Sequence, residues 1–423
     1  MSIAQSNQIE YVDDVLHVEG VSLIELASAV GTPAYVYSRA HIVSAVDALN
    51  QAFANSALNI HYAVKANSNL GLLKLFHELG TGFDIVSGGE LTRVMAAGGD
   101  PASVIFSGVG KTTEEIDFAL KVGIECFNVE SASELARISE RATLLGQAAP
   151  ISLRVNPNVD AQTHPYISTG LKQNKFGVAP ALALELYQQA AENPQLRIVG
   201  IDCHIGSQIN QIDPLLDALS DLLQLVDQLQ ELGISLEHID LGGGMGIAYE
   251  DETPLDIAAY GSAVQQLMGS RPQSLVLEPG RMLVANAGVL LARVEYLKPG
   301  VDGAPNFAVV DAAMNDLIRP ALYQAWHAVQ AVEQASSVEA MAWDIVGPVC
   351  ESGDFLAKGR DLALQEGALV AIASAGAYGM VQASNYNSRG RACEVLVNGD
   401  EFSIVRRRET IQDQLRLEQE PAP

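Results

Sequence analysis

The chain has 423 residues and carries 25 basic against 51 acidic side chains, which gives a formal charge of −26 at pH 7. Such acidity excludes nucleic acids and anionic membrane surfaces as partners, because both are bound mainly through Lys and Arg. Apolar residues make up 48% of the chain, enough for large cores, and the length indicates two or three domains.

The N-terminal residues and the cysteines favour a cytoplasmic protein. The start of the chain contains neither the basic nor the apolar segment of a secretion signal, and no apolar run is long enough to span a membrane. The four cysteines are scattered without a C-x-x-C pair. We therefore expect no disulfide framework, no zinc site and no other metal.

A regular alternation of strand and helix runs from about residue 57 to 280. The expected strands are 59–64, 83–86, 103–106, 125–129, 151–155, 198–204, 237–241 and 274–278. Capping-box pairs open three of the helices: Ser87 with Glu90, Thr112 with Glu115, and Ser131 with Glu134. Because strands that alternate with helices form parallel sheets, eight such units predict an α/β fold with a (β/α)8 TIM barrel rather than an open sheet.

The remaining segments predict a second domain. The fifth unit contains a long polar connection, residues 156–177, and long loops in compact domains are usually functional. After residue 280, short alternating segments separated by Gly, Pro and Asn indicate a mostly antiparallel β domain of the β-sandwich or β-barrel type. We therefore expect a barrel domain at 35–280 and a second domain formed by 1–34 and 281–423.

Polar residues follow nearly every expected barrel strand, where the active site of such a barrel lies. Each has an ordinary structural explanation, because loops begin at strand ends, so the functional interpretation depends on their combination. In chain order they are Lys65, Ser87, Ser107, Glu130, Asn156, His204 with Ser207, the glycines 242–244, and Glu278 with Gly280 and Arg281.

Lys65 is the only one of the eight lysines that closes an expected barrel strand. A lysine at a strand end can simply be solvated. At a barrel mouth, its amine can instead form a Schiff base with a carbonyl. An aldehyde cofactor would need such an amine.

The glycine run 242–246 fails the dinucleotide-binding fingerprint, because no third glycine has the required spacing. It follows the seventh strand, and Gly280 and Arg281 follow the eighth, which are the two loops where barrels of this kind bind phosphate. Exposed backbone N–H groups and the hydroxyl of Ser207 suit a phosphate dianion. Arg281 can complement it or bind a substrate carboxylate.

Two interpretations of Glu278 and of His204 stay open. Glu278 ends the eighth expected strand, either as a salt-bridged acid or, beside a pyridine cofactor, as the group that keeps the ring nitrogen protonated. His204 ends the sixth, either as a buried core histidine or as a ring that stacks on such a cofactor.

Several motifs along the chain form a recognisable set. They are YAVKANSN (62–69), FDIVSGGE (83–90), HIGSQI (204–209), GGGMG (242–246), EPGR (278–281), MNDLIRPALY (314–323), CESGD (350–354), AYGM (377–380) and SNYNSR (384–389). Together they resemble the pyridoxal-phosphate decarboxylases of the alanine-racemase-like barrel class, which is fold type III. MNDLIRPALY and CESGD narrow the resemblance to the diaminopimelate decarboxylase family, whereas HIGSQ is shared with ornithine and arginine decarboxylases.

The resemblance implies a pyridoxal 5'-phosphate cofactor joined covalently to Lys65. It also implies that His204 stacks on the cofactor ring and that Glu278 pairs with the ring nitrogen. The expected phosphate ligands are Ser207, Gly243, Gly244, Gly280, Arg281 and Tyr378.

For the substrate, the resemblance implies a site that recognises an amino-acid group at the far end of the molecule. The expected substrate-binding residues are Arg281, Arg319, Tyr323, Glu351 and Tyr378. Cys350 is expected to return a proton after carbon dioxide leaves. In the family, Cys350 and Glu351 enter from the partner subunit, so the resemblance implies a homodimer with shared sites.

The expected reaction is therefore decarboxylation of meso-2,6-diaminopimelate to L-lysine and carbon dioxide, the last step of lysine biosynthesis. Arg319 and Glu351 form the cation and anion pair that such a substrate requires, since a planar guanidinium binds a carboxylate well. Three alternatives stay open: decarboxylation of ornithine, D-lysine, arginine or carboxynorspermidine, racemisation of an amino acid, or non-catalytic binding of the cofactor.

Overall fold

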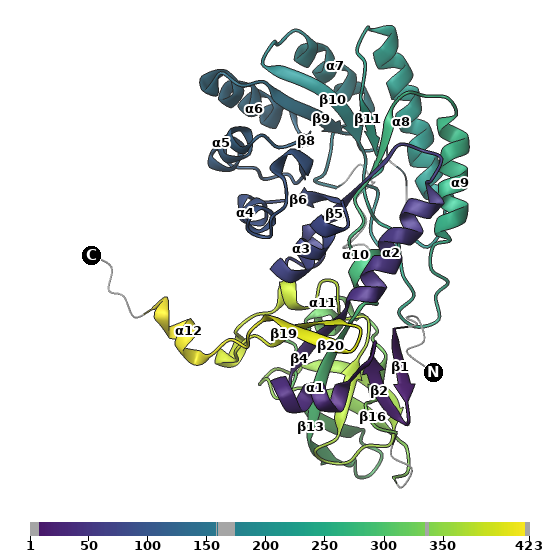
Figure 1. Ribbon diagram of the computed structural model, residues 1–423, viewed down its shortest axis with the longest axis vertical. Coiled ribbons are helices and arrows are strands. Elements are labelled where there is room, and N and C mark those ends of the chain that lie inside the picture. The colour runs from purple at the N-terminus through teal and green to yellow at the C-terminus, as the bar shows by residue number, and fades with distance from the viewer. Residues whose placement is uncertain (1–7, 158, 160–173, 335–337, 419–423) are drawn as a thin grey trace. The chain divides into compact units, whose positions relative to one another are not determined.

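The computed structural model describes residues 8–157, 159, 174–334 and 338–418 (Figure 1). It divides into two compact units, which are described separately. One unit comprises residues 45–247 and 253–282, and the other comprises 1–44, 248–252 and 283–423. Among the described residues, no helix is both long and apolar enough to cross a membrane.

The first unit is a closed barrel of eight parallel strands, which confirms the predicted fold class. In space, the strands run in chain order around the barrel until β12 pairs with β5 and closes it. The strands are β5 (Leu58–Ala63), β6 (Gly82–Ile85), β7 (Val104–Phe106), β8 (Cys126–Val129), β9 (Ala149–Arg154), β10 (Leu196–Asp202), β11 (His238–Asp240) and β12 (Ser274–Leu277).

Helices alternate with the strands and surround them (Figure 1). They are α2 (Arg39–Ala52), α3 (Leu70–Glu78), α4 (Gly88–Ala96), α5 (Thr113–Val122), α6 (Ala132–Leu145), α7 (Pro180–Ala191), α8 (Asp213–Glu231), α9 (Ile257–Met268) and the short α10 (Arg281–Val284). The amphipathic pattern explains their place, because α8 buries eight side chains on one side, among them Leu215, Leu219, Leu222 and Val226.

The predicted capping boxes are present in part. Thr112 and Glu115 make both reciprocal hydrogen bonds at the start of α5. Ser87 and Ser131 also cap α4 and α6, but Glu90 and Glu134 accept hydrogen bonds from the N–H one residue before each cap. The sequence therefore locates these three helix starts correctly.

The second unit is built around a nine-stranded, mostly antiparallel sheet. Its strands are β4 (Ala34–Ser38), β13 (Gly288–Lys298), β14 (Asn306–Val310), β15 (Val329–Ala331), β16 (Met341–Val346), β17 (Phe355–Leu362), β18 (Leu369–Ile372), β19 (Cys393–Asn398) and β20 (Glu401–Arg406). A small sheet of β1 (Ile9–Val12), β2 (Val15–Val18) and β3 (Val21–Ser22) precedes it, together with α1 (Leu23–Val30). Two more short helices, α11 (Arg319–Tyr323) and α12 (Ile411–Arg416), complete the unit.

The unit to which strand β4 belongs differs from the one expected from sequence. The expected domain limits place residues from 35 onward with the barrel. β4 pairs with β13 on one side and with β19 on the other, so it lies within the sheet of the second unit. All five of its residues are buried. The physical reason is its long-range pairing, which an apolar sequence such as AYVYS does not reveal.

Candidate active site

Lys65 lies in a single 3-10 turn, residues Val64–Ala66, directly after β5. The parallel register of β5 and β6 places Ala63 opposite Asp84. The Lys65 Nζ is 2.6 Å from the Asp84 Oδ2, and the Asp84 side chain is fully buried, whereas that of Lys65 is 37% exposed. This ion pair fixes the amine at the carboxyl end of the barrel.

His204 follows β10, and its Nδ1 accepts a hydrogen bond from the Gly243 N–H at 3.1 Å. Burial lowers the pKa of His204 well below its usual value, and the positive charges of Arg154 and Lys65 act in the same direction. Because Nδ1 is the acceptor, the neutral ring carries its proton on Nε2. The site therefore presents an uncharged, flat imidazole.

The loop after β11 needs glycine for close packing. A Cβ on Gly243 would lie 2.2 Å from the Glu278 carbonyl oxygen, and one on Gly244 would lie 2.4 Å from the Gly206 oxygen. Gly244 also has φ +90°, a backbone conformation that residues other than glycine rarely adopt. Gly280 is less crowded but still tight, since its Cβ would lie 3.0 Å from the Cβ atoms of both Ala63 and Ala66.

Arg281 and Ser207 are brought together beside these glycines. The Arg281 Nη2 donates a hydrogen bond to the Ser207 Oγ at 3.0 Å, and Arg281 is only 7% exposed. A guanidinium, a hydroxyl and glycine N–H groups are the donors that a phosphate dianion requires.

Glu278 comes directly after β12 and is 6% exposed. Its Oε1 accepts hydrogen bonds from the Asn128 Nδ2 at 3.3 Å and the Ser107 Oγ at 3.5 Å. Burial raises the pKa of Glu278 well above its usual value, and the charges of Asp84 and Asp202 raise it further. Ser107 was expected at the barrel mouth, whereas Asn128 was not.

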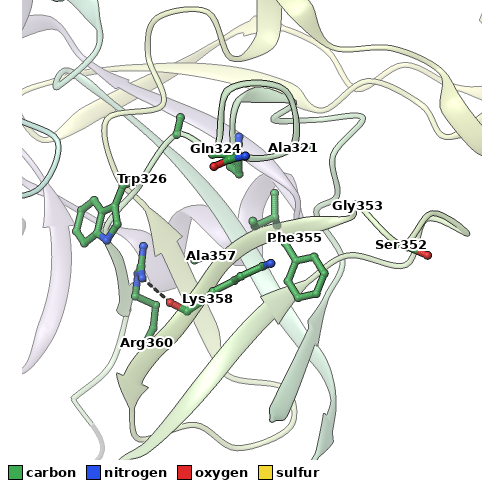
Figure 2. Close-up of a pocket in the computed structure, with 12 residues that line it drawn as sticks. Ala321, Gln324, Trp326, Ser352, Gly353, Phe355, Ala357, Lys358 and Arg360 are labelled. Atoms are coloured by element: carbon green, nitrogen blue, oxygen red, sulfur yellow. Dashed lines mark hydrogen bonds between the residues drawn. The ribbon is translucent and has the colours of Figure 1, made fainter. Parts of the chain in front are cut away.

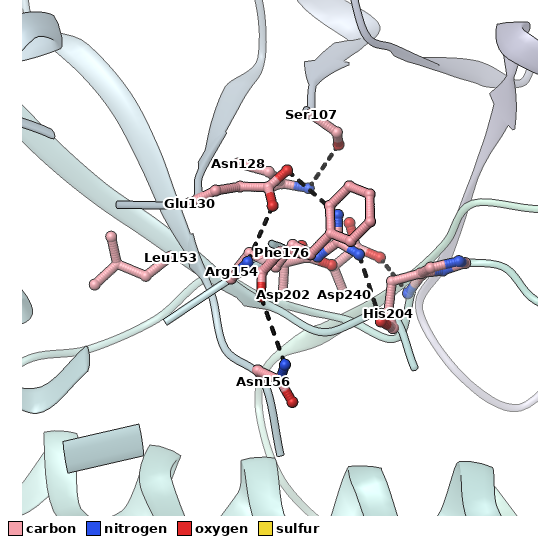
Figure 3. Close-up of polar contacts among 12 residues, drawn as sticks. Ser107, Asn128, Glu130, Leu153, Arg154, Asn156, Phe176, Asp202, His204 and Asp240 are labelled. Atoms are coloured by element: carbon pink, nitrogen blue, oxygen red, sulfur yellow. Dashed lines mark hydrogen bonds and ion pairs between the residues drawn. The ribbon is translucent and has the colours of Figure 1, made fainter. Parts of the chain in front are cut away.

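Figure 3 shows a buried ionic network around Arg154 that the sequence did not predict. It includes Asp202, a carboxylate oxygen of which lies within 4.8 Å of one of Glu278. Arg154, the last residue of β9, lies 3.3 Å from the Glu130 Oε1 and 3.8 Å from the Asp202 Oδ2. It also donates a hydrogen bond to the His204 carbonyl at 3.4 Å. Asp202 and Asp240 are the last residues of β10 and β11. Polar residues at the ends of apolar strands are the signal that could have identified them.

In the second unit, Arg319 begins α11 and is 7% exposed. Its guanidinium carbon lies 5.1 Å from the ring centre of Tyr249 and 5.9 Å from that of Tyr323. Its Nε donates a hydrogen bond to the His327 Nε2 at 3.4 Å. Tyr249 and His327 are contacts that the sequence did not predict, and they hold the guanidinium plane in a fixed orientation.

Cys350 and Glu351 are both exposed, and Cys350 is a free thiol. The Cys350 N–H donates a hydrogen bond to the Asn387 Oδ1 at 3.1 Å, and the Tyr386 hydroxyl donates one to the Glu351 Oε2 at 3.0 Å. The SNYNSR segment therefore holds the backbone at Cys350 and the side chain of Glu351.

Asp354 fastens the CESGD loop to the MNDLIRPALY segment. Its Oδ1 accepts a hydrogen bond from the Met314 N–H at 2.7 Å, and its Oδ2 accepts one from the Val349 N–H at 2.8 Å. Arg389 adds a third connection, because its Nε donates to the Asn315 Oδ1 at 3.0 Å. Three motifs that are distant in sequence are thus joined within one unit.

A cavity of about 540 Å³ opens beside the CESGD loop, between the end of α11 and β17 (Figure 2). In its wall, the Arg360 guanidinium stacks on Trp326 at 4.4 Å and donates to the Lys358 carbonyl at 2.6 Å. The sequence did not predict this cavity.

The predicted site residues fall into two sets, one in each unit. Within the barrel unit, the structure brings together Lys65, His204, Ser207, Gly243, Gly244, Glu278, Gly280 and Arg281. The second unit contains Arg319, Tyr323, Cys350, Glu351 and Tyr378. Tyr378 is half-buried and has φ 55°. Most of the long connection 156–177 lies outside the described residues.

Comparison with known proteins agrees with this site. The family model for the pyridoxal-binding domain of pyridoxal-dependent decarboxylases matches residues 39–285. Diaminopimelate decarboxylase of Pseudomonas aeruginosa is 59% identical over 403 residues, which cover 95% of this chain and 96% of that protein. The Haemophilus influenzae enzyme of the same name is 51% identical and covers 97% and 99%.

Solved structures give the same result. Diaminopimelate decarboxylase from Helicobacter pylori, complexed with L-lysine, has a TM-score of 0.90 at 41% identity and covers 93% of this chain and 98% of that one. The M. jannaschii enzyme in complex with L-lysine has a TM-score of 0.93 at 37% identity and covers 98% of both chains. The fold and site define a pyridoxal-phosphate-dependent decarboxylase, and the chain belongs to the diaminopimelate decarboxylase family.

The residues of the barrel unit fit pyridoxal phosphate. The crowded glycines leave no room for side chains, the Arg281 and Ser207 pair supplies phosphate donors, and His204 offers an uncharged ring. Glu278 supplies a carboxylate and Lys65 an amine that is 37% exposed. This donor set matches the aldehyde, ring and phosphate of the cofactor.

Proposed function

We propose that this protein converts meso-2,6-diaminopimelate into L-lysine and carbon dioxide. The observation that carries the proposal is the buried Arg319, whose guanidinium is oriented by the rings of Tyr249 and Tyr323. A planar guanidinium held in this way suits a carboxylate at the far end of the substrate. Ornithine, arginine and D-lysine have no such carboxylate.

The barrel residues would hold the cofactor and orient the substrate. When bound, pyridoxal phosphate delocalises the electron pair that remains on the α carbon after decarboxylation. Lys65 would provide the amine that joins the cofactor aldehyde, His204 would lie against the ring, and Glu278 would hold a proton at the ring nitrogen. The phosphate is assigned to Ser207, Gly243, Gly244, Gly280, Arg281 and Tyr378.

The CESGD residues complete the proposed site. Cys350 is an exposed thiol and would donate the proton that replaces carbon dioxide. Glu351, held by the Tyr386 hydroxyl, would bind the distal ammonium group of the substrate. Arg281 and Tyr378 would contribute further substrate contacts.

We further propose a homodimer in which Cys350 and Glu351 act in the partner's site, and a cytoplasmic location, where a free thiol persists. Mixing the inactive variants Lys65→Ala and Cys350→Ala tests the shared site. Random exchange of subunits restores one intact site in about half of the dimers, or about a quarter of the wild-type activity. Absence of recovery after confirmed subunit exchange would contradict the proposal.

The reaction itself is tested with a substrate panel of meso-2,6-diaminopimelate, ornithine, arginine, D-lysine and carboxynorspermidine. We expect carbon dioxide and L-lysine from the first and a kcat/KM that is at least about 100-fold lower for the others, because a site built for a charged group rejects substrates that lack it. Epimerised product without carbon dioxide would indicate a racemase. Borohydride reduction and peptide mapping should tag Lys65, and a tag elsewhere would contradict the cofactor assignment.

A further inference from the structure

Five buried carboxylates gather at the carboxyl ends of the barrel strands, and within the described residues three of them form an ion pair. Asp84 pairs with Lys65, and Glu130 and Asp202 pair with Arg154. In the described part of the chain, no Lys, Arg or His nitrogen lies within 4.0 Å of a carboxylate oxygen of Asp240 or Glu278. These two acids are 0% and 6% exposed.

Asp240 and Glu278 also lie against each other. Together with Asp202, they have carboxylate oxygens within 4.8 Å of one another. A side-chain hydrogen bond to Glu278 is among the causes that raise the pKa of Asp240. The Asp240 Oδ2 has no donor among the described residues. Two carboxylates can form a hydrogen bond only when one of them carries a proton. Two ionised carboxylates that lie side by side in a buried site, with no cation paired to either, would also repel each other strongly.

The remaining hydrogen bonds indicate which acid keeps the charge. Glu278 accepts from two side-chain donors, Asn128 and Ser107, which stabilise an ionised carboxylate. Among the described residues, the carboxyl group of Asp240 accepts one hydrogen bond, from the Gly242 N–H at 2.8 Å, through its Oδ1. The Oδ2 of Asp240 is therefore the favoured position of the proton. Burial raises the pKa of both acids, but the hydrogen bond between them acts in opposite directions: it raises the pKa of Asp240 and lowers that of Glu278, in agreement with this assignment.

We propose that Asp240 is protonated in the working enzyme and acts as a positioning residue, donating a hydrogen bond that holds the ionised Glu278 in place. This inference rests on the proposed role of Glu278 at the cofactor ring nitrogen. Asp240 also binds the Gly242 N–H, and the Glu278 N–H donates to the Gly242 carbonyl at 2.7 Å. The Asp240 carboxyl group thus connects Gly242, in the glycine loop, to Glu278, the acid proposed to bind the ring nitrogen.

Asp202 provides a matched control, because it lies directly opposite Asp240 in the parallel register of β10 and β11. Both are buried aspartates at strand ends, but Asp202 faces Arg154 at 3.8 Å. An amide can replace a protonated carboxyl group as a donor at Asp240, whereas at Asp202 it removes a carboxylate that lies 3.8 Å from the Arg154 guanidinium. The two Asp→Asn variants should therefore behave differently.

The first test is a pH titration of the visible cofactor absorption in the holoenzyme, without substrate, for wild type, Asp240→Asn, Asp240→Leu and Asp202→Asn. We expect Asp240→Leu to shift the titration and to lower kcat about 10-fold or more with little change in KM. Asp240→Asn should rescue the titration and most of the activity, and Asp202→Asn should not match the wild type. Equal damage by both Asp240 variants would overturn the proposal, as would a loss of thermal stability in Asp240→Leu without a spectral shift.

The second test detects the proton directly. The infrared spectrum of the holoenzyme should contain a buried protonated-carboxyl band that is absent in Asp240→Asn and present in Asp202→Asn. Persistence of the band in Asp240→Asn would overturn the assignment, and so would a stoichiometric metal ion that elemental analysis finds in wild type but not in Asp240→Asn. The spectral titration and the infrared band are both read without substrate turnover, so a different substrate would leave these two results intact while contradicting the proposed function.

Discussion

The Nδ1 of His204 accepts the backbone N–H of Gly243 at 3.1 Å, so the imidazole and the glycine loop hold each other in place. The hydrogen bond links two loops that follow neighbouring strands, β10 and β11. It also fixes the neutral form of the ring that is assigned to the cofactor. A change in the glycine loop should therefore affect cofactor binding before it affects chemistry.

Gly243→Ala tests this relationship. The added methyl group would lie 2.2 Å from the Glu278 carbonyl oxygen, which forces the loop to move. We expect at least about a 10-fold loss of affinity for pyridoxal phosphate, measured by titrating the apoprotein, since one distorted charge-assisted contact costs about 1.5 kcal/mol or more. Gly110→Ala is the control, because a Cβ there meets no atom within 4 Å. Wild-type affinity in Gly243→Ala would show that the loop does not hold the phosphate.

Cys350→Ala should retain the cofactor and lose turnover. The Cys350 thiol is exposed, and the hydrogen bond to Asn387 comes from the Cys350 backbone N–H, which alanine keeps, so removal of the thiol should leave the fold intact. Loss of a general acid lowers kcat by about 100-fold or more. Stopped-flow release of carbon dioxide should stay fast while product formation slows. Loss of the cofactor absorption would instead indicate a structural role.

Replacement of Arg319 should raise KM for diaminopimelate and shift the substrate preference. Arg319→Lys keeps a charge but loses the planar fork and its stacking on Tyr249 and Tyr323. We expect KM to rise about 10-fold or more in Arg319→Lys and further in Arg319→Met, in steady-state assays. An unchanged KM in Arg319→Met would remove the main support for the proposed substrate.

Asp354→Ala should loosen the CESGD loop. The side chain is 4% exposed overall and accepts the N–H groups of Met314 and Val349. Loss of two hydrogen bonds to a buried carboxylate should lower the free energy of unfolding by about 3 kcal/mol. Chemical denaturation of the variant measures this, with Asp361→Ala as an exposed control on the same unit. A change in the free energy of unfolding below about 0.5 kcal/mol, the range of ordinary surface substitutions, would contradict the proposal that Asp354 holds the CESGD loop in place.

His238 should make the protein less stable in acid. It is buried at the start of β11 against Gly200, and burial lowers its pKa from 6.5 to about 4. The unfolded chain binds a proton at this group below pH 6.5, whereas the folded chain binds it only near pH 4. Stability is therefore full above pH 6.5 and falls by about 3 kcal/mol as the pH drops to 4.

Urea unfolding at several pH values measures this effect. His238→Asn should show a shallower loss between pH 6.5 and 4 than the wild type. His77→Asn, at an exposed position on α3, should keep the wild-type slope. Equal slopes in His238→Asn and wild type would show that another group controls the acid sensitivity.

The barrel could be predicted from sequence because each strand has a recognisable pattern in its own residues and those that follow it. All eight expected segments contain an observed strand or most of it, since apolar runs are followed by turns and capped helices. The residues after the strands, from Lys65 to Arg281, were found by the same rule. Their chemical roles came from the family resemblance and stay predictions until the variants above are measured.

The parts that escaped prediction depend on distant partners. Asp202 and Asp240 lie inside segments that read as apolar strands, and their importance comes from the contacts with Arg154 and Glu278. Tyr249 and Arg319 are similarly far apart in the chain but meet within one unit. Pairing between remote side chains leaves no local pattern in a single sequence.

Strand β4 has a consequence for how the chain folds during synthesis. Its neighbours, β13 and β19, begin at Gly288 and Cys393, whereas all barrel strands end by Leu277. At about 5 to 20 residues per second, the ribosome completes β19 roughly 20 to 70 seconds after β4 emerges. Until then, the apolar AYVYS segment has at least one unpaired strand edge. Premature termination before β19 would therefore leave a truncated chain prone to pairing with other chains through this edge.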